Sequence, residues 1–212
     1  MRRLPVYLVI DTSGSMTGEP IESVKNGLQM LISSLRQDPY ALETAFVSVI
    51  TFGSDAKQDV PLTELSQFQN PDLVASGTTA MGAALALLAD CIQREVGKGS
   101  AEQKGDWKPV VFLLSDGSPT DDLSFGLKAL TAVKTGTFVC CAVGPSADTS
   151  ALKQISEIVV NLDTADSNSI KSFFKWVSSS ISVSSQKVEQ NKKEVAGLDD
   201  LPPPPPEVNV VM

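Results

Sequence analysis

The sequence contains no histidine at all. This absence excludes Ser-His-Asp and Cys-His mechanisms and the usual zinc sites. Basic residues are also in the minority, because 17 Lys and Arg stand against 25 Asp and Glu and give a formal net charge of −8. The basic residues are scattered and form no stripe, which argues against binding to a nucleic-acid backbone. The acidic balance is compatible with cation binding.

Cysteine is scarce as well, with Cys91, Cys140 and Cys141 the only three. The last two are adjacent in an apolar run, so their side chains point to opposite faces of a predicted strand and are poorly placed to bridge each other. No Cys-x-x-Cys spacing occurs. We therefore expect three small core residues in a protein of a reducing compartment.

Long apolar runs are missing, and no stretch approaches the length needed to span a membrane. Arg2 and Arg3 precede an apolar run, but that run is short, ends at Asp11 and lacks the small-residue cleavage site of a signal peptide. We therefore expect a cytoplasmic protein. The patterns Gly-x-x-x-x-Gly-Lys and Gly-x-Gly-x-x-Gly are absent too, which argues against a nucleotide site.

Strand and helix patterns alternate along the chain. This alternation predicts an α/β fold with a doubly wound, mostly parallel central sheet and helices on both faces. A more polar segment at 56–65 contains Pro61 and predicts one short antiparallel edge strand. Buried strands are expected at 6–10, 44–52, 109–114, 137–143 and 158–162, and helices at 20–38, 77–92, 120–133, 149–156 and 169–182.

The composition changes near residue 184. Gln, Asn, Lys and Glu take over there, and five consecutive prolines follow at 202–206. Such a segment brings little apolar surface to bury. We expect residues 1–183 to form one domain and residues 184–212 a polar, proline-rich tail that is disordered or loosely packed.

Two of the predicted buried strands end on a carboxylate followed by small polar residues. The first ends at Asp11, with Ser13 and Ser15 at two-residue steps, and the other ends at Asp116. Ligands of an open α/β sheet sit outside the carboxyl ends of its strands, so these side chains are expected to meet. Either aspartate alone could be only a turn residue, because Asp favours turns. Their shared position favours a functional site.

A loop between these strands adds Thr78 or Thr79. Two carboxylates and three hydroxyls are hard oxygen ligands, which suit Mg²⁺, with Mn²⁺ or Ca²⁺ as alternatives. Because the hydroxyls are neutral, part of the positive charge of the ion would remain uncompensated. We expect a partner protein to complete its coordination with an Asp or Glu.

The motifs Asp-x-Ser-x-Ser, Gly-Thr-Thr and Leu-Leu-Ser-Asp-Gly occur in this order. Together they make residues 5–183 resemble a von Willebrand factor A domain with a metal-ion-dependent adhesion site. The resemblance implies that the hydroxyls coordinate the metal and that the carboxylates act directly or through water. Family members often read Gly-Thr-x-Thr, whereas this chain reads Thr78-Thr79-Ala80, which leaves Thr79 as an alternative ligand. The ligand set implied is Asp11, Ser13, Ser15, Thr78 and Asp116.

Further segments resemble the bacterial cytoplasmic branch of this family that is linked to tellurite resistance. They are Asp-Gly-Ser-Pro-Thr-Asp, Gly-Asp-Trp-Lys-Pro and Phe-Phe-Lys-Trp-Val-Ser-Ser-Ser. This resemblance implies an intracellular interaction module that works beside kinase-like and phosphatase-like proteins in stress resistance. It implies neither a nucleic acid nor a membrane as partner.

The competing hypothesis is a Mg²⁺-dependent phosphatase or phosphotransferase that uses Asp11 as its nucleophile, as haloacid-dehalogenase enzymes do. Those enzymes need a second Asp two residues later, where this chain has Ser13. With no histidine, a general base is also hard to find. We therefore expect a binding module and not an enzyme.

Several neighbouring residues have simpler explanations. Ser118 and Thr120 are interpreted as turn and helix-cap residues, and Asp121 as a residue that shapes the site. Trp176 lies off the main apolar stripe of the last helix, and Trp107 lies in a polar loop. Both tryptophans are candidates for partner contacts.

Overall fold

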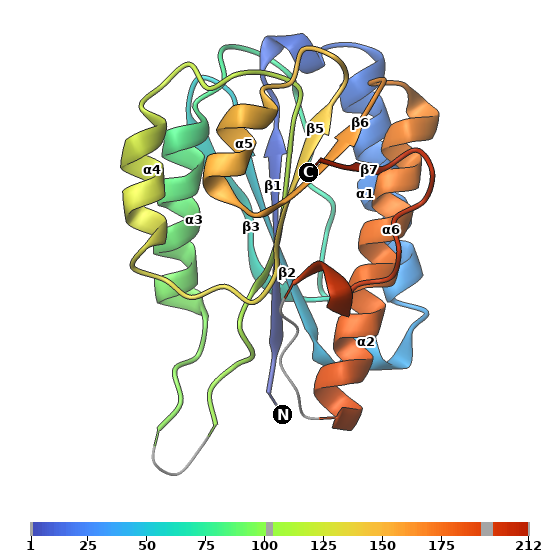
Figure 1. Cartoon of the computed structure of the whole chain (residues 1–212). Coiled ribbons are helices and arrows are strands. Elements are labelled where there is room, and N and C mark those ends of the chain that lie inside the picture. Colours follow the sequence, from blue (N-terminus) through green and yellow to red (C-terminus); the bar gives the residue numbers. More distant parts are fainter. Residues whose placement is uncertain (1, 101–103, 192–196, 212) are drawn as a thin grey trace.

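The computed structural model describes residues 2–100, 104–191 and 197–211. Within them a seven-stranded sheet has the order β3-β2-β1-β4-β5-β6-β7 (Figure 1). The strands are β1 (Leu4–Asp11), β2 (Ala45–Phe52), β3 (Ala56–Glu64), β4 (Val110–Ser115), β5 (Phe138–Val143), β6 (Ile158–Leu162) and β7 (Asn209–Val210).

The five central strands are parallel, and the two edge strands β3 and β7 are antiparallel to their neighbours. The predicted fold class and the antiparallel strand at 56–65 are confirmed. The second antiparallel edge strand, β7, is not among the sequence predictions. Two paired residues show no alternation that a pattern could detect.

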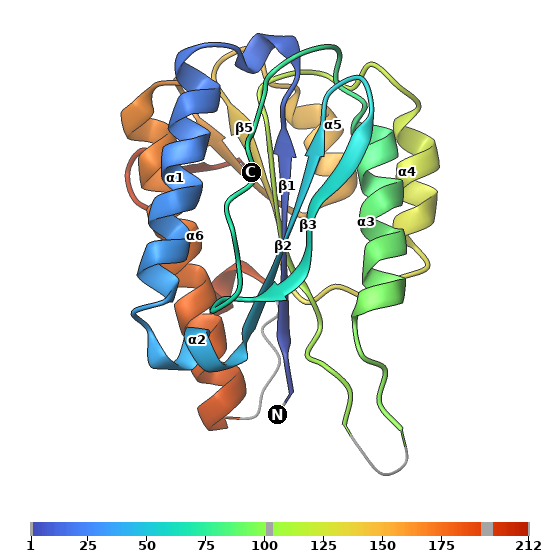
Figure 2. The same cartoon turned by 180° about the vertical axis from the view of Figure 1, so that it is seen from behind.

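Among the described residues, six α-helices cover the two faces of the sheet. Figures 1 and 2 show α1, α2 and α6 on one face and α3, α4 and α5 on the other. Three shorter helical turns lie at Gly14–Met16, Lys187–Asn191 and Leu198–Asp200. The α-helices are α1 (Glu19–Leu35), α2 (Pro39–Thr44), α3 (Met81–Glu95), α4 (Leu123–Leu130), α5 (Thr149–Ile155) and α6 (Ser167–Gln186).

The central strand β1 contributes side chains to both layers of the core. Val6 and Leu8 pack into the cluster that contains α1 and α6, whereas Tyr7 and Val9 pack into the cluster that contains α3. Successive side chains of a strand point to opposite faces, so a strand covered on both sides is apolar throughout. The three cysteines are buried and unpaired in this core, as predicted.

The helix predictions differ from the structure at some boundaries. Helix α2 was not predicted; Asp38 caps it by accepting hydrogen bonds from the N–H groups of Tyr40 and Ala41. The N-cap of α4 is Asp122 and not Thr120. The last helix is longer than predicted and continues to Gln186. None of the described helices is long and apolar enough to cross a membrane.

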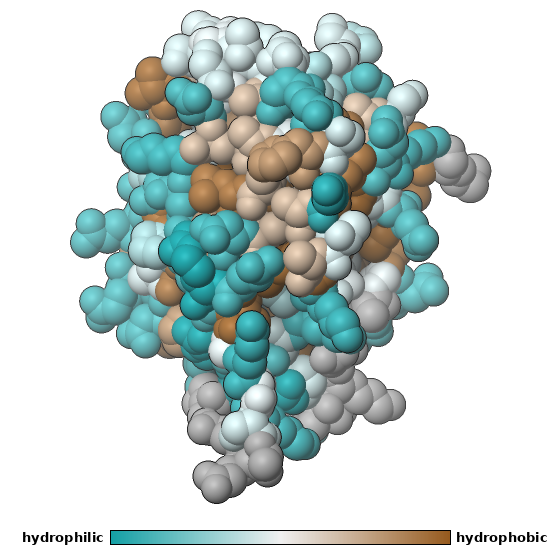
Figure 3. Space-filling view, turned by 90° about the vertical axis from the view of Figure 1, so that its left-hand side faces the viewer, coloured by the Kyte–Doolittle hydropathy of each residue, from teal (hydrophilic) through white to brown (hydrophobic). Residues whose placement is uncertain are grey.

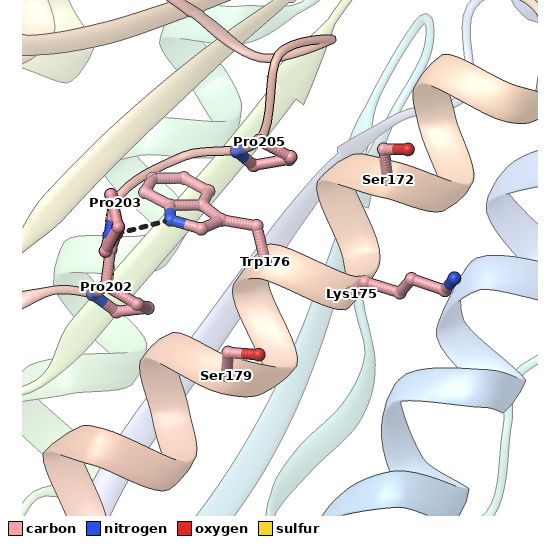
Figure 4. Close-up of a pocket in the computed structure, with 7 residues that line it drawn as sticks. All are labelled: Ser172, Lys175, Trp176, Ser179, Pro202, Pro203 and Pro205. Atoms are coloured by element: carbon pink, nitrogen blue, oxygen red, sulfur yellow. Dashed lines mark hydrogen bonds between the residues drawn. The ribbon is translucent and has the colours of Figure 1, made fainter.

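Several described residues beyond 183 pack against the rest of the chain, whereas residues 192–196 and 212 of the expected tail lie outside the described residues. Val188, Leu201 and Val208 are buried, and β7 pairs with β6. Lys187 Nζ lies 2.8 Å from Asp200 Oδ1. The proline-rich segment runs along α6, where Trp176 Nε1 donates a 2.8 Å hydrogen bond to the carbonyl oxygen of Pro202 (Figure 4). The few buried apolar residues of this segment therefore hold it against the rest of the chain at separate points.

Neither tryptophan is available as a partner contact, because both are buried. Trp176 packs edge-on against Phe112, with ring centroids 6.5 Å apart. Trp107 lies under the guanidinium of Arg2, whose Cζ is 3.5 Å from the centre of the indole. Tertiary contacts therefore bury two tryptophan side chains that the sequence pattern alone did not place in the core.

We expect Trp176→Phe to lower the free energy of unfolding by about 1 kcal/mol, because it removes one hydrogen bond and leaves the Pro202 carbonyl without its donor. Urea denaturation measures this loss, and limited proteolysis should cleave the C-terminal segment faster in the variant. Phe173→Leu, a change on the same helix that leaves the indole bond intact, serves as control. Equal cleavage of wild type and Trp176→Phe would show that the bond does not hold the tail.

Candidate metal centre

The candidate site lies at the carboxyl edge of the sheet, the upper edge in Figure 1, where β1 and β4 end side by side. Ile10 pairs with Leu114, so Asp11 and Ser115 follow as neighbours on adjacent strands. Ser115 Oγ donates a 2.5 Å hydrogen bond to Asp11 Oδ2. The parallel register therefore brings together two segments that are 104 residues apart in the sequence.

Asp11 is fully buried and organises the loop that follows it. Its Oδ1 accepts a 2.8 Å hydrogen bond from the backbone N–H of Ser13. Asp residues favour such turns because the carboxylate bonds to the backbone two residues later. The turn interpretation and the functional interpretation of Asp11 are therefore compatible, since this turn presents the two serines.

Three oxygen atoms form a continuous chain beside Asp11. Ser13 Oγ lies 3.0 Å from Ser15 Oγ, and Ser15 Oγ lies 2.8 Å from Asp116 Oδ1. Neighbouring ligands of an octahedral Mg²⁺ at 2.0–2.1 Å are about 2.9 Å apart, which is that distance multiplied by the square root of two. Each successive pair of these oxygens thus has the spacing of two adjacent positions around such an ion.

Glycines hold the loops close together. The N–H of Gly14 donates to the carbonyl oxygen of Gly77 at 3.0 Å, and Ser76 N–H donates to Thr12 at 2.8 Å. Gly77 has φ +79°, and a Cβ there would overlap with Ser54 Oγ. Only glycine adopts this backbone without strain and leaves this space open.

The structure distinguishes the two threonines of the intervening loop. Thr78 is exposed, and its N–H lies 3.2 Å from Ser54 Oγ. Thr79 is buried, and a Cβ on Gly117 would lie only 3.6 Å from Thr79 Oγ1. The hydroxyl of Thr79 therefore lies beside the loop that carries Asp116.

Burial raises the pKa of both site carboxyl groups. For Asp11 the largest cause is loss of solvent, opposed by hydrogen bonds from Ser115 and Ser13, and the nearby charge of Asp116 raises its pKa further. Loss of solvent also raises the pKa of Asp116. Two carboxylates that are costly to ionise together are stabilised by a cation between them. The electrostatics of the site thus fit a bound metal.

The donor set fits a hard cation. Within the described residues no group of three or more His, Cys, Asp or Glu side chains could hold a metal. The two carboxylates are instead accompanied by hydroxyls, so all donors are oxygen atoms, as Mg²⁺, Mn²⁺ and Ca²⁺ prefer. A bound ion would supply positive charge and a position for an external ligand.

Two neighbouring residues, Thr120 and Asp121, shape the site. Thr120 Oγ1 accepts a 3.0 Å bond from the N–H of Thr79, and Thr120 N–H donates to the Thr79 carbonyl at 2.9 Å. Asp121 accepts hydrogen bonds from the N–H groups at the start of α3, and Ser118 is exposed. The sequence interpretation missed Ser115. Its only signal is its place between a buried strand and Asp116.

Comparisons with known proteins agree with this architecture. A family model described as von Willebrand factor type A domain matches residues 6–176. No curated protein matches the sequence.

Solved structures with the same fold come from distant proteins. Proximal thread matrix protein 1 from the mussel byssus is 17% identical, with a TM-score of 0.62 over 84% of this chain and 48% of that protein. The ArnB paralog VWA2 from Sulfolobus acidocaldarius is 16% identical, with a TM-score of 0.59 over 87% and 45%. Another structure of the mussel protein, 19% identical with a TM-score of 0.59 over 87% and 46%, has a zinc-occupied MIDAS motif. This chain spans about half the length of these proteins.

Proposed function

This chain belongs to the von Willebrand factor type A domain family, and we propose that it binds a partner protein through a divalent metal at the carboxyl edge of its sheet. The family is one of metal-binding interaction modules. We further propose that the metal is Mg²⁺ and that an Asp or Glu of the partner completes its coordination.

The row of oxygens from Ser13, Ser15 and Asp116 carries this proposal. Their spacing provides adjacent ligand positions, and Asp11 fixes the loop from beneath. Ser15 is exposed, so the ligand row opens to solvent on one side. A cation with few anionic ligands on the protein side has both the charge and the free position to take a carboxylate from outside.

The environment of Asp11 supports binding over catalysis. A nucleophilic carboxylate must reach the phosphorus atom of a substrate, but Asp11 is fully buried. Its two oxygens already accept hydrogen bonds from Ser13 and Ser115. We therefore propose a binding role and not the phosphatase alternative.

The biological setting is a proposal from sequence resemblance. The chain resembles the bacterial tellurite-resistance protein TerY in the segments named above. We propose a cytoplasmic role in tellurite or stress resistance, with kinase-like or phosphatase-like proteins as partners. The buried, unpaired cysteines are compatible with a reducing compartment.

A pull-down from a lysate of a tellurite-resistant bacterium tests the central proposal. The immobilised chain, Asp11→Asn and the control Asp72→Asn are each compared in Mg²⁺ and in EDTA. Asp72 is a suitable control because its side chain is 88% exposed and lies outside the ligand row. We expect a partner that is retained by wild type and Asp72→Asn only in Mg²⁺. Retention in EDTA or by Asp11→Asn would contradict metal bridging.

We propose Thr79 as the third hydroxyl ligand. Thr79→Ala should weaken Mg²⁺ binding on the order of tenfold, whereas Thr78→Ala should leave it within about twofold. The two variants are matched in chemistry and differ only in which hydroxyl is removed. Isothermal titration calorimetry measures both affinities, and melting curves in EDTA show whether each variant is folded. Loss of affinity in Thr78→Ala alone would assign the ligand to Thr78.

A further inference from the structure

The loops around the candidate metal centre are acidic and contain no basic residue. They follow β1, β2, β4, β5 and β6 and comprise residues 12–18, 53–55, 116–122, 144–148 and 163–166. In all of these segments there is no Lys or Arg. Their aspartates are Asp55, Asp116, Asp121, Asp122, Asp148, Asp163 and Asp166.

Two basic residues on the adjoining elements are paired with other carboxylates. Lys25 on α1 lies 2.8 Å from Glu22, and Lys57 on β3 lies 2.6 Å from Asp59. A divalent ion would balance Asp11 and Asp116, and the other six loop aspartates have no basic residue within these loops. Hydrogen bonds lower the pKa of Asp122 and Asp166, so these two are charged at neutral pH. The edge around the metal therefore remains negative when the metal is bound.

Helix α4 presents an apolar face next to this edge. Of its eight residues only Gly126 is buried, and Phe125 is 62% exposed. Figure 3 shows this side of the molecule, with apolar side chains gathered across its middle. A hollow of about 360 Å³ lies between α4 and α5 and is lined by Leu127, Leu130 and Ile155, among others.

The apolar face follows the metal loop directly in the chain. The loop 116–122 joins Asp116 directly to α4. Asp121 fixes this loop by accepting 2.9 and 2.8 Å bonds from the N–H groups of Gly82 and Ala83. The first turn of α4, with Phe125, is therefore held beside the metal loop, and the apolar face continues the proposed interface.

We propose that the partner presents its metal-binding Asp or Glu between Lys or Arg residues and next to a leucine-sized apolar side chain that covers Phe125. This inference rests on the proposed metal bridge. Basic neighbours complement the six other loop aspartates, whereas acidic neighbours would be repelled by them. An apolar neighbour removes the exposed ring from water. The recognised element is thus a short basic and apolar segment of protein around one carboxylate.

Four labelled nine-residue peptides test this chemistry by fluorescence anisotropy with the full chain in Mg²⁺. The reference peptide has a central Asp with Lys on both sides and Leu beyond each Lys. The other three replace Lys by Glu, Leu by Ser, or the central Asp by Asn. We expect the reference peptide to bind at least about tenfold more tightly than the Glu peptide and about threefold more tightly than the Ser peptide. The preference for Lys over Glu should shrink as salt is raised.

Matched protein variants assign these preferences to residues. Asp163→Asn should reduce the preference for Lys, whereas Asp90→Asn, an exposed change on α3 outside the loops, should not. Phe125→Ser should remove the preference for Leu and, because the ring is exposed, should leave the melting temperature nearly unchanged.

The possible failures are distinguishable. Equal binding of the Lys, Glu and Ser peptides, with the Asn peptide inactive, would overturn this inference and leave the metal bridge standing. Binding of the reference peptide that survives EDTA and the Asn replacement would be charge attraction alone and would also overturn it. No Mg²⁺-dependent binding of any Asp peptide would overturn the proposed function itself.

Discussion

Replacing Asp11 by Asn is expected to weaken Mg²⁺ binding by about 100-fold or more and, in EDTA, to raise the melting temperature. The first effect arises because the Asp11 carboxylate supplies a negative charge to the site and orders the turn at Ser13. The second follows from burial, because an ionised Asp11 in the metal-free fold has no cation beside it. Asn keeps the shape and can still accept from Ser13 and donate to Ser115.

The pH dependence of stability in EDTA has a definite sign. The pKa of Asp11 is raised in the folded state, so the fold favours the neutral carboxyl group. Its contribution to stability falls as pH rises from the ordinary Asp range through the raised pKa and is recovered as pH is lowered. Asn does not titrate. The advantage of Asp11→Asn over wild type should therefore be largest at neutral pH and shrink toward acidic pH.

Calorimetric titration with Mg²⁺ and melting curves in EDTA at several pH values measure the two effects. Asp72→Asn is the matched control, since its side chain is exposed and removes the same charge elsewhere. At a Mg²⁺ concentration that saturates the wild type but not the variant, the order of stability should reverse, because the ion stabilises the chain that binds it more tightly. If the wild type were more stable than Asp11→Asn in EDTA at neutral pH, the buried charge of Asp11 would not destabilise the metal-free fold, and this prediction would be wrong.

Gly126→Ala is expected to destabilise the protein by about 1–3 kcal/mol, although Ala is the better helix former. A Cβ at this position would overlap with the carbonyl oxygen of Gly82 and lie 2.8 Å from Leu85 Cβ. A backbone carbonyl cannot rotate aside as a flexible side chain can. The two helices α3 and α4 must separate, and the loop held by Asp121 must move with them.

Chemical denaturation measures this change, and Mg²⁺ titration shows whether displacement of the loop weakens the metal site. The control is Ala129→Gly on the same helix, which should cost only the helix propensity of about 1 kcal/mol and leave the metal affinity unchanged. A Gly126→Ala variant as stable as wild type would show that the two helices can part without cost.

The site prediction shows where sequence reasoning is strong. Asp11, Ser13, Ser15 and Asp116 are brought together because parallel strands place their carboxyl ends at one edge. That rule needs only two buried strands and their order. It does not say which of two adjacent hydroxyls faces the site. Thr78 is exposed and Thr79 is buried, and the N–H of Thr79 is held by Thr120, which is distant in the sequence.

The sequence by itself determined the fold class, the antiparallel strand at 56–65, and the acidic edge with its hydroxyls. Continuous apolar runs, helical periodicity and residue chemistry are local properties, and each is legible within a few residues.

The tertiary structure alone decided the positions of Trp176 and the tail, the short elements α2 and β7, and the cap of α4. Each depends on contacts between distant segments. Trp176 is buried because Pro202 offers it an acceptor, and β7 exists because β6 offers it an edge. Thr120 leaves the capping role to Asp122 because its hydroxyl is engaged with Thr79. Such choices arise where several local solutions are nearly equal in energy and packing selects one.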